Sequence, residues 1–141
     1  MTEDTYAGDV TPTETWEALS DDPAAVLVDV RTDAEWKYVG VADLSDLDKE
    51  PVLIPWQVFP AMEPNPDFVQ ILRDQGLTQE TPVYFLCRSG ARSRSAAIAM
   101  TAAGFGHCYN IIAGFEGDTD GNNHRGTVNG WKVDRLPWRQ G

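Results

Sequence analysis

Residues 83–97, with the sequence VYFLCRSGARSRSAA, join an apolar run to a polar loop and then to a run of small residues. The apolar run follows Pro82 and ends at Cys87, and its polar boundaries favour a buried strand. The stretch from Ser93 to Ala103 is rich in alanine and stops at Gly104, which is typical of a helix. The sequence therefore predicts that Cys87 lies in a loop between the carboxyl end of a strand and the amino end of a helix.

This loop has the properties of an anion-binding site with a reactive thiol. Unpaired backbone N–H groups and the helix dipole attract negative charge, and Gly90 lets the backbone fold inward without a steric penalty. Arg88, Arg92 and Arg94 are three of only 11 Lys and Arg residues in a chain of net charge -11. Because helix N-termini and neighbouring arginines favour the thiolate, we expect Cys87 to be ionised and nucleophilic. The alternative is a small buried hydrophobic residue, as free cysteines often are.

The six-residue loop from Cys87 to Arg92, CRSGAR, resembles the active-site loop of single-domain members of the rhodanese family of sulfurtransferases. The resemblance implies that Cys87 takes a sulfane sulfur from a small anionic donor such as thiosulfate. It then carries the sulfur as a persulfide and passes it to cyanide, a thiol or a protein acceptor. Protein tyrosine phosphatases and Cdc25-like phosphatases place the arginine one residue further on, in a wider loop that fits phosphate. The spacing here favours sulfur chemistry.

Each part of the loop has an expected role. Backbone N–H groups between Arg88 and Arg92 should point at the sulfur and stabilise the thiolate and the persulfide. Arg88 should point outward and guide the anionic donor, while Arg92 braces the loop and adds positive potential. Ser89 and Ser93 are expected to donate hydrogen bonds to the persulfide. The predicted site has Cys87 as the nucleophile and a binding loop made of Arg88, Ser89, Gly90, Ala91, Arg92 and Ser93.

A second motif lies in residues 27–36, LVDVRTDAEW. It resembles the second-strand motif of the same family, in which an aspartate, an arginine and a glutamate form a polar network that supports the catalytic end of the sheet. We therefore expect a supporting role for Asp29, Arg31 and Glu35. The alternative is a solvated ion pair between Arg31 and Glu35. Between Val39 and Glu50 the resemblance fails, because the usual histidine is absent, and the conformation there is not predicted.

The alternation of strands and helices predicts an α/β domain of three layers with a mainly parallel sheet. Two helix starts carry capping-box signatures, at Thr11 and at Thr32. The family resemblance adds a five-stranded sheet in the order 1-5-4-2-3 and a rhodanese-like α/β/α architecture. The expected strands are residues 6–10, 26–28, 52–55, 83–87 and 108–112. We expect a flexible N-terminus at residues 1–5 and a single domain at residues 6–141, with a polar loop insertion at 118–130.

Composition limits the remaining possibilities. With 141 residues, 42% of them hydrophobic and 23% charged, the chain fits one globular domain. No apolar run approaches the length of a membrane span, and the acidic start lacks a secretory signal, so the expected compartment is the cytoplasm. The negative net charge disfavours nucleic acid and anionic membranes as partners. We expect Cys87 and Cys108 at opposite edges of the sheet and unpaired, and the proposed chemistry requires no metal or organic cofactor.

Two further features are candidates for binding sites. Trp56, Phe59 and Met62 follow the third predicted strand and are candidates for the wall of a substrate pocket. In the insertion, the spacing of Asp118 and Asp120 resembles a calcium-binding EF-hand loop. However, the required glycine and the closing glutamate are missing, so a polar loop is the better interpretation.

The sequence is also compatible with two other functions. The domain is alternatively a sulfur carrier or binding module that a partner desulfurase loads without turnover. The third possibility is a small Cdc25-like phosphatase or arsenate reductase, which the short loop disfavours. Each alternative uses Cys87, so the sequence alone does not separate them.

Overall fold

A central parallel sheet organises the molecule, which was analysed as a computed structural model that describes residues 6–58 and 63–140. Its strands lie in the order β1-β8-β7-β2-β4, and every pairing between neighbours is parallel. Numbered among themselves along the chain, these five strands run 1-5-4-2-3. The expected α/β architecture with a parallel sheet is thus confirmed. The bounds are Gly8–Val10 for β1, Val26–Asp29 for β2, Val52–Leu53 for β4, Val83–Leu86 for β7 and Cys108–Ile111 for β8.

The described residues form four α-helices beside the sheet: α1 (Pro12–Asp21), α2 (Asp33–Tyr38), α3 (Phe68–Asp74) and α4 (Ala91–Ala102). The predicted capping boxes at the starts of α1 and α2 are both present. In each, the threonine hydroxyl oxygen (Thr11 or Thr32) accepts from the backbone N–H of the glutamate three residues later, and that glutamate's carboxylate accepts from the threonine N–H. Helix α4 starts two residues earlier than predicted. Arg94 N–H already donates to the Gly90 carbonyl at 3.1 Å, so the helix begins directly after the glycine.

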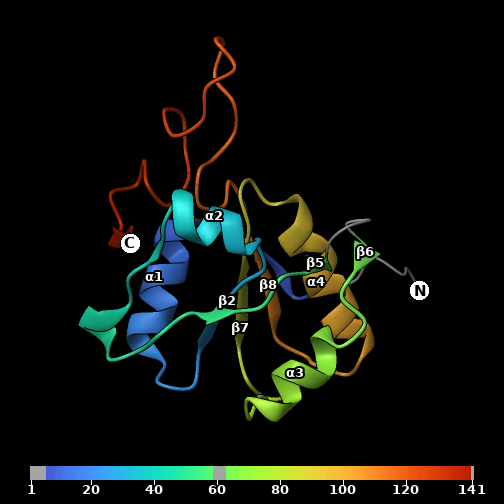
Figure 1. Cartoon of the computed structure of the whole chain (residues 1–141). Helices are drawn as coiled ribbons and strands as arrows, with labels where there is room; N and C mark the ends of the chain where they lie inside the picture. The colour runs from blue at the N-terminus through green and yellow to red at the C-terminus, as the bar shows by residue number, and fades with distance from the viewer. Residues whose placement is uncertain (1–5, 59–62, 141) are drawn as a thin grey trace.

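Helices cover both faces of the sheet (Figure 1). Helices α3 and α4 pack on one face, where their apolar side chains meet strand residues such as Val28 and Phe85. Helix α1 packs on the other face, with Leu27 and Leu86 of the same strands and Trp131 of the C-terminal segment. Successive residues of one strand thus serve opposite faces. The result is the predicted three-layer arrangement with a hydrophobic cluster on each side.

Four short strands were not predicted. Strands β3 (Val41–Ala42) and β9 (Trp138–Arg139) form an antiparallel pair, and so do β5 (Gln57–Val58) and β6 (Glu63–Pro64). The first pair gives structure to the segment that the resemblance left open, together with a 3₁₀ turn at Ser45–Leu47. Gly40 enters this pair with φ of 111°, and a Cβ there would lie 2.7 Å from the Arg139 carbonyl oxygen. Two-residue strands carry no periodicity that a sequence could reveal.

The polar insertion forms a loop that projects from the body of the molecule (Figure 1). The Asp120 carboxylate organises it, since it accepts from the Asn122 and His124 N–H groups and from the Thr127 hydroxyl. The hydrogen bond from the His124 N–H is the first cause of a lowered pKa for Asp120. In the described ranges no group of three or more His, Cys, Asp or Glu side chains is placed to hold a metal ion.

Some of the residues for which the sequence makes predictions are not described by the structure. The N-terminal residues 1–5 lie outside the described part of the chain, as do Phe59 and Met62. No helix within residues 6–58 and 63–140 has the length and apolar character that crossing a membrane requires.

Candidate active site

The cysteine loop connects β7 to α4 at the carboxyl end of the parallel sheet. Cys87 follows the last residue of β7, and Gly90 precedes the first turn of α4 with φ of 116°. This backbone conformation is strained for any residue with a Cβ, so a glycine is needed to turn the chain into the helix. The predicted corner between a strand and a helix N-terminus is therefore present.

The sulfur of Cys87 lies under this corner, with the residue only 1% exposed. The Gly90 N–H donates to Sγ at 3.1 Å, and the Ser93 hydroxyl lies 3.2 Å from Sγ. The sequence had predicted that several amides between Arg88 and Arg92 point at the sulfur. Among the described residues, Gly90 supplies the one backbone N–H that donates to Sγ.

Segment 113–117 holds the cysteine loop from outside. The Phe115 N–H donates to the Cys87 carbonyl at 2.8 Å, and the Glu116 and Gly117 N–H groups donate to the Arg88 carbonyl at 3.0 and 3.1 Å. Gly114 makes this approach possible, since a Cβ there would lie 2.4 Å from the Cys87 carbonyl oxygen. This clamp was not predicted. Its one signal in the sequence is Gly114, two residues after the last predicted strand, since a glycine permits a close backbone approach.

Arg92 is bound to Glu35 of α2. Its two Nη atoms lie 2.7 and 2.9 Å from the two carboxylate oxygens, and both side chains are 20% exposed. Burial alone would raise the pKa of Glu35, but the hydrogen bond and charge of Arg92 outweigh it and hold the pKa below its ordinary value. The hydrogen bond to Glu35 likewise raises the pKa of Arg92. Arg92 thus joins the first turn of α4 to α2, and its positive charge faces the Glu35 carboxylate.

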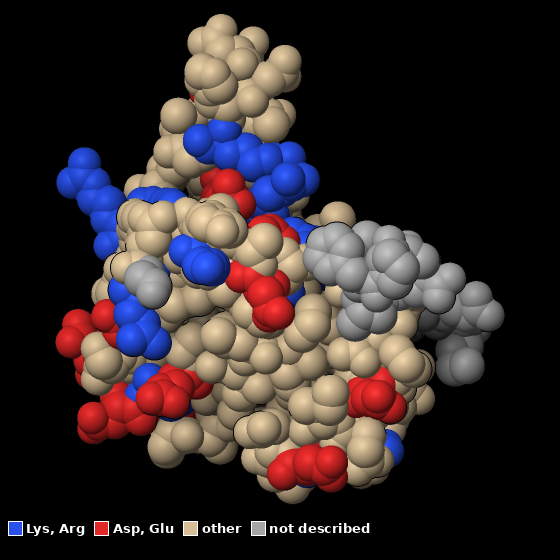
Figure 2. Space-filling view, viewed as in Figure 1, with Lys and Arg blue, Asp and Glu red and all other residues tan. Residues whose placement is uncertain are grey.

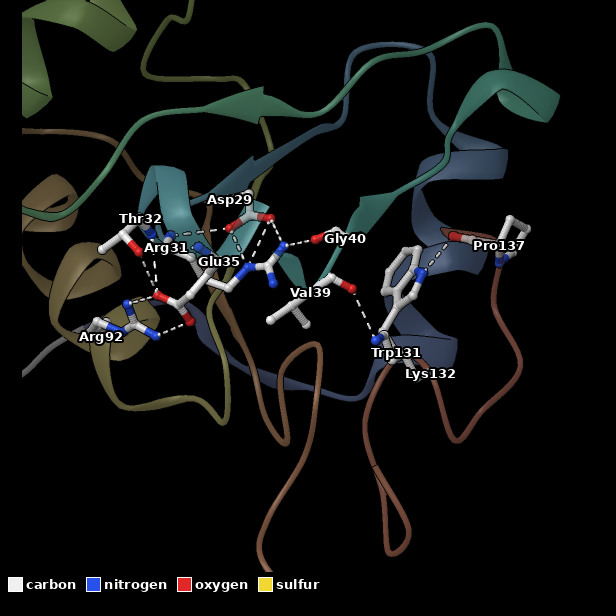
Figure 3. A network of polar contacts seen from close by, with 10 residues as sticks. All are labelled: Asp29, Arg31, Thr32, Glu35, Val39, Gly40, Arg92, Trp131, Lys132 and Pro137. Carbon is white, nitrogen blue, oxygen red and sulfur yellow. Dashed lines mark hydrogen bonds and ion pairs between the residues drawn. The ribbon is translucent and has the colours of Figure 1, made fainter. Parts of the chain in front are cut away.

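The supporting triad divides into two separate ion pairs (Figure 3). Arg31 pairs with Asp29 through bonds of 2.7 to 3.2 Å and donates to the Gly40 carbonyl at 2.7 Å. The expected alternative, a solvated Arg31–Glu35 pair, is wrong, because Arg31 is fully buried and Glu35 binds Arg92. The Cζ atom of Arg31 lies 4.3 Å from the centre of the Phe115 ring, and the buried Nη1 of Arg31 has no hydrogen-bond partner among the described residues. Arg31 thus supports the residue whose N–H holds the Cys87 carbonyl.

A shallow pocket of about 460 Å³ opens beside the loop. In Figure 2 basic side chains gather at this end of the molecule, at the foot of the projecting loop, with acidic side chains beside them. Arg88 is exposed here, whereas Ser89 is half-buried and Ala91 is exposed. Trp56 is not among the residues that line this pocket, and its ring packs edge-on against Phe68 at 5.2 Å. The pocket is lined by Thr32, Glu35, Val39, Gln57, Arg88, Arg92 and Glu116.

The second cysteine is remote from the first. Cys108 begins β8 opposite Val83, at the start of β7, while Cys87 follows the end of β7. Four residues of strand separate the two levels by roughly 13 Å, beyond disulfide reach. Both cysteines are free, as expected. Burial raises the pKa of Cys108 to about 11, so this thiol stays protonated at neutral pH.

Comparison with known proteins agrees with this architecture. The crystal structure of Rv0390 from Mycobacterium tuberculosis superposes with a TM-score of 0.88 at 51% sequence identity, covering 97% of this chain and 100% of that one. The uncharacterized protein RC0915 of Rickettsia conorii is 38% identical over 90% of this chain and 93% of its own length.

More distant structures share the fold. The polysulfide-sulfur transferase homodimer of Wolinella succinogenes matches with a TM-score of 0.63 at 21% identity, covering 98% of this chain and 80% of that one. A rhodanese-like domain protein of Staphylococcus aureus matches with a TM-score of 0.50 at 20% identity, over 77% of this chain and 87% of that one. The protein-family model described as the STR4 middle domain matches residues 7–141. The chain therefore belongs to the family that this model describes, the rhodanese-like family of the STR4 middle domain.

Proposed function

We propose that the chain is a sulfurtransferase that moves a sulfane sulfur from an anionic donor such as thiosulfate to a thiophilic acceptor through a persulfide on Cys87. One observation carries the proposal: the Gly90 N–H reaches Cys87 Sγ at 3.1 Å where α4 begins. A backbone donor at a helix N-terminus stabilises an anion without supplying a proton. Membership of a rhodanese-like family supports the same chemistry.

The reaction consists of two displacements. In the first, the Cys87 thiolate attacks the outer sulfur of thiosulfate, a new S–S bond forms, and sulfite leaves with the electron pair of the broken bond. In the second, cyanide or a thiolate attacks the outer sulfur of the persulfide and receives it, and Cys87 leaves as a thiolate. Sulfur is conserved and no external oxidant is needed. Covalent catalysis of this kind replaces one difficult transfer with two easier ones.

The surrounding residues have distinct parts in this proposal. Exposed Arg88 lines the pocket and attracts the anionic donor. Arg92 and Glu35 hold the start of α4 against α2. Asp29 and Arg31 act further back, through the Phe115 ring, on the clamp that binds the Cys87 carbonyl. They are positioning residues, since the described contacts do not bring them to the sulfur.

The same geometry disfavours phosphatase or arsenate reductase activity. The loop has four residues between the cysteine and the arginine, one fewer than in the phosphatases it resembles. Both Nη atoms of Arg92 are bound to Glu35, so the guanidinium does not face an oxyanion above the sulfur. A tetrahedral oxyanion would require this ion pair to break.

A direct test compares three proteins: the wild type, Cys87→Ser and Cys108→Ser. Each is assayed for thiocyanate formation from thiosulfate and cyanide, and for phosphate release from an aryl phosphate. We expect thiocyanate from the wild type and from Cys108→Ser, and none from Cys87→Ser. Intact-protein mass spectrometry should show one added sulfur on Cys87 after thiosulfate treatment, and cyanide should remove it.

Other outcomes would overturn the proposal. Phosphate release without thiocyanate would identify a phosphatase. An added sulfur that appears only with a desulfurase, without turnover of thiosulfate, would identify a carrier module. Transfer that persists in Cys87→Ser would exclude Cys87 as the nucleophile.

A further inference from the structure

A line of buried polar groups runs from Cys87 to the surface. The Ser93 Oγ lies 3.2 Å from Cys87 Sγ and donates to Asn110 Oδ1 at 2.6 Å. The Asn110 Nδ2 in turn donates to Asp9 Oδ1 at 3.1 Å. Ser93 is fully buried and Asn110 is 3% exposed, whereas Asp9 is exposed. Asp9 and Asn110 are register partners in the parallel pair β1–β8, so the pairing of the strands itself joins them.

The direction of these hydrogen bonds follows from the chemistry of the groups. An ionised carboxylate only accepts, so Asn110 must turn its NH₂ group toward Asp9 and its oxygen toward Ser93. An amide oxygen also only accepts, so the single proton of the Ser93 hydroxyl points at Asn110. The Gly90 carbonyl, 3.1 Å from Ser93 Oγ, is a second acceptor on that side. Ser93 therefore presents a lone pair, and not its proton, to Cys87.

We propose that Asp9 is a positioning residue that, through Asn110 and Ser93, favours the protonated thiol of Cys87. In this arrangement the Cys87 S–H donates to Ser93, and the thiolate loses that hydrogen bond. Ser93 thus has the opposite role to the one expected from the sequence, where it donates to the sulfur. The significance of this control rests on the proposed function, in which Cys87 is the nucleophile.

Other charged and titratable groups lie near the two ends of this line of polar groups. Arg88 flanks Cys87 in the chain, and Arg92, which lies near enough to sense its charge, is paired with Glu35. At the surface end the Tyr6 hydroxyl donates to Asp9 Oδ1 at 2.7 Å, and Arg94 lies over the Tyr6 ring. Burial, followed by the hydrogen bond to Asp9, raises the pKa of Tyr6, so this hydroxyl remains a donor at neutral pH. The variants of Asp9 and Ser93 that test the proposal keep Arg88, Arg92, Glu35, Tyr6 and Arg94 unchanged.

The test measures the thiol directly and needs no sulfur transfer. Thiolate absorbance in the ultraviolet is recorded against pH, each protein minus its Cys87→Ser counterpart, and alkylation of Cys87 by iodoacetamide is followed by peptide mass spectrometry. In Asp9→Asn the new amide can offer either group to Asn110, which can then turn and let Ser93 donate to the sulfur. We expect the titration to move down by roughly half a pH unit, and alkylation below the midpoint to become about threefold faster.

Two further variants separate this effect from a change of charge. Ser93→Ala removes the acceptor of the S–H without changing any charge, so its titration should also move down. Asp9→Glu keeps a carboxylate and should return the titration toward that of the wild type. An unchanged titration in Asp9→Asn, or an upward shift in Ser93→Ala, would overturn the proposal. Because the thiol is titrated without a sulfur donor, these results stand whether or not the chain transfers sulfur.

Discussion

At the scale of single residues, the two arginines of the cysteine loop have different surroundings and therefore different expected effects. Arg88 is exposed on the pocket, whereas both Nη atoms of Arg92 are bound to Glu35. Only an arginine without a carboxylate partner offers its full charge to an incoming anion. We therefore propose the steering role for Arg88 and the bracing role for Arg92.

Arg88→Ala should weaken use of the anionic donor. We expect the KM for thiosulfate to rise about tenfold while kcat stays within about twofold, because the side chain binds the donor without contacting the transferred sulfur. The measurement is a thiosulfate saturation curve at constant ionic strength. Arg73→Ala is the matched control, because this substitution removes the same charge away from the pocket. Arg73 belongs to α3 and donates to the Ala103 carbonyl, at the far end of α4. Equal KM changes in both variants would point to a general effect of net charge.

Glu35 should link stability to pH. Its pKa is lower in the folded protein than in the unfolded chain, so the Glu35–Arg92 pair contributes stability above the unfolded pKa, and this contribution is lost as pH falls through the folded value. We expect Glu35→Gln to be about 1 kcal/mol less stable than the wild type at pH 7, a modest value because the pair is partly exposed. Urea unfolding at several pH values measures the difference. A difference that stays unchanged as pH falls well below the ordinary pKa of a glutamate would contradict the assignment.

Residue chemistry was predictable where it follows from local spacing. The positions of Cys87, Gly90 and Arg92 in a strand–loop–helix corner follow from fifteen consecutive letters. The contact between Asp9 and Asn110 does not, because it depends on the register of β1 against β8, and these residues lie far apart in the chain. The Glu35–Arg92 pair was missed for the same reason. Long-range partners of buried polar groups need a three-dimensional arrangement that residue spacing does not encode.

At the scale of elements, the clamp formed by segment 113–117 determines where the cysteine loop sits. Gly114→Ala should displace it, because the new Cβ would meet the Cys87 carbonyl oxygen at 2.4 Å and the Arg88 carbonyl oxygen at 2.6 Å. We expect a loss of roughly 2–4 kcal/mol in the free energy of unfolding and slower sulfur transfer in the protein that remains folded. Denaturant titrations and the thiocyanate assay measure the two effects.

Gly121→Ala is the control for this variant, because a Cβ at Gly121 in the projecting loop meets nothing within 4 Å. Its stability should stay within about 0.5 kcal/mol of the wild type. If Gly114→Ala were as mild as Gly121→Ala, the close approach of the two segments would not constrain the loop.

The elements themselves were predictable to the extent that they carry local signals. The starts of α1 and α2 follow from their capping boxes, in which a threonine and a glutamate three residues later satisfy each other's backbone groups. The pairs β3–β9 and β5–β6 have no such signal. A strand of two residues is defined by its partner, and the partner of β3 lies at the other end of the chain.

At the scale of the whole molecule, the parallel sheet brings the parts of the site together. Strands β2 and β7 are register partners, so their carboxyl ends place the Asp29–Arg31 pair and Cys87 at one end of the sheet. Strand β8, the last of these five strands along the chain, leads into segment 113–117, which holds the cysteine loop. The site is therefore built from segments between residues 29 and 117, and its geometry depends on both hydrophobic clusters.

This dependence predicts that the molecule unfolds as one unit. Leu72 of α3 belongs to the cluster on the face covered by α3 and α4, and Leu19 of α1 belongs to the cluster on the other face; both are essentially fully buried. Each Leu→Ala change should lower the free energy of unfolding by about 2–5 kcal/mol. Because the strands between the clusters are shared, each change should move the whole transition.

Urea unfolding of Leu19→Ala and Leu72→Ala, followed by far-ultraviolet circular dichroism and by tryptophan fluorescence, tests this prediction. The two probes should give coincident transitions in the wild type and in both variants, with similar slopes. The probes differ in what they sense: fluorescence reports the tryptophan environments, with Trp16 and Trp131 in the cluster of α1 and Trp56 against the other cluster, whereas circular dichroism reports all helices. Transitions that separate between the two probes in Leu19→Ala, while they stay coincident in the wild type, would mean that one face unfolds before the other, and residues 6–141 would then not form a single cooperative domain.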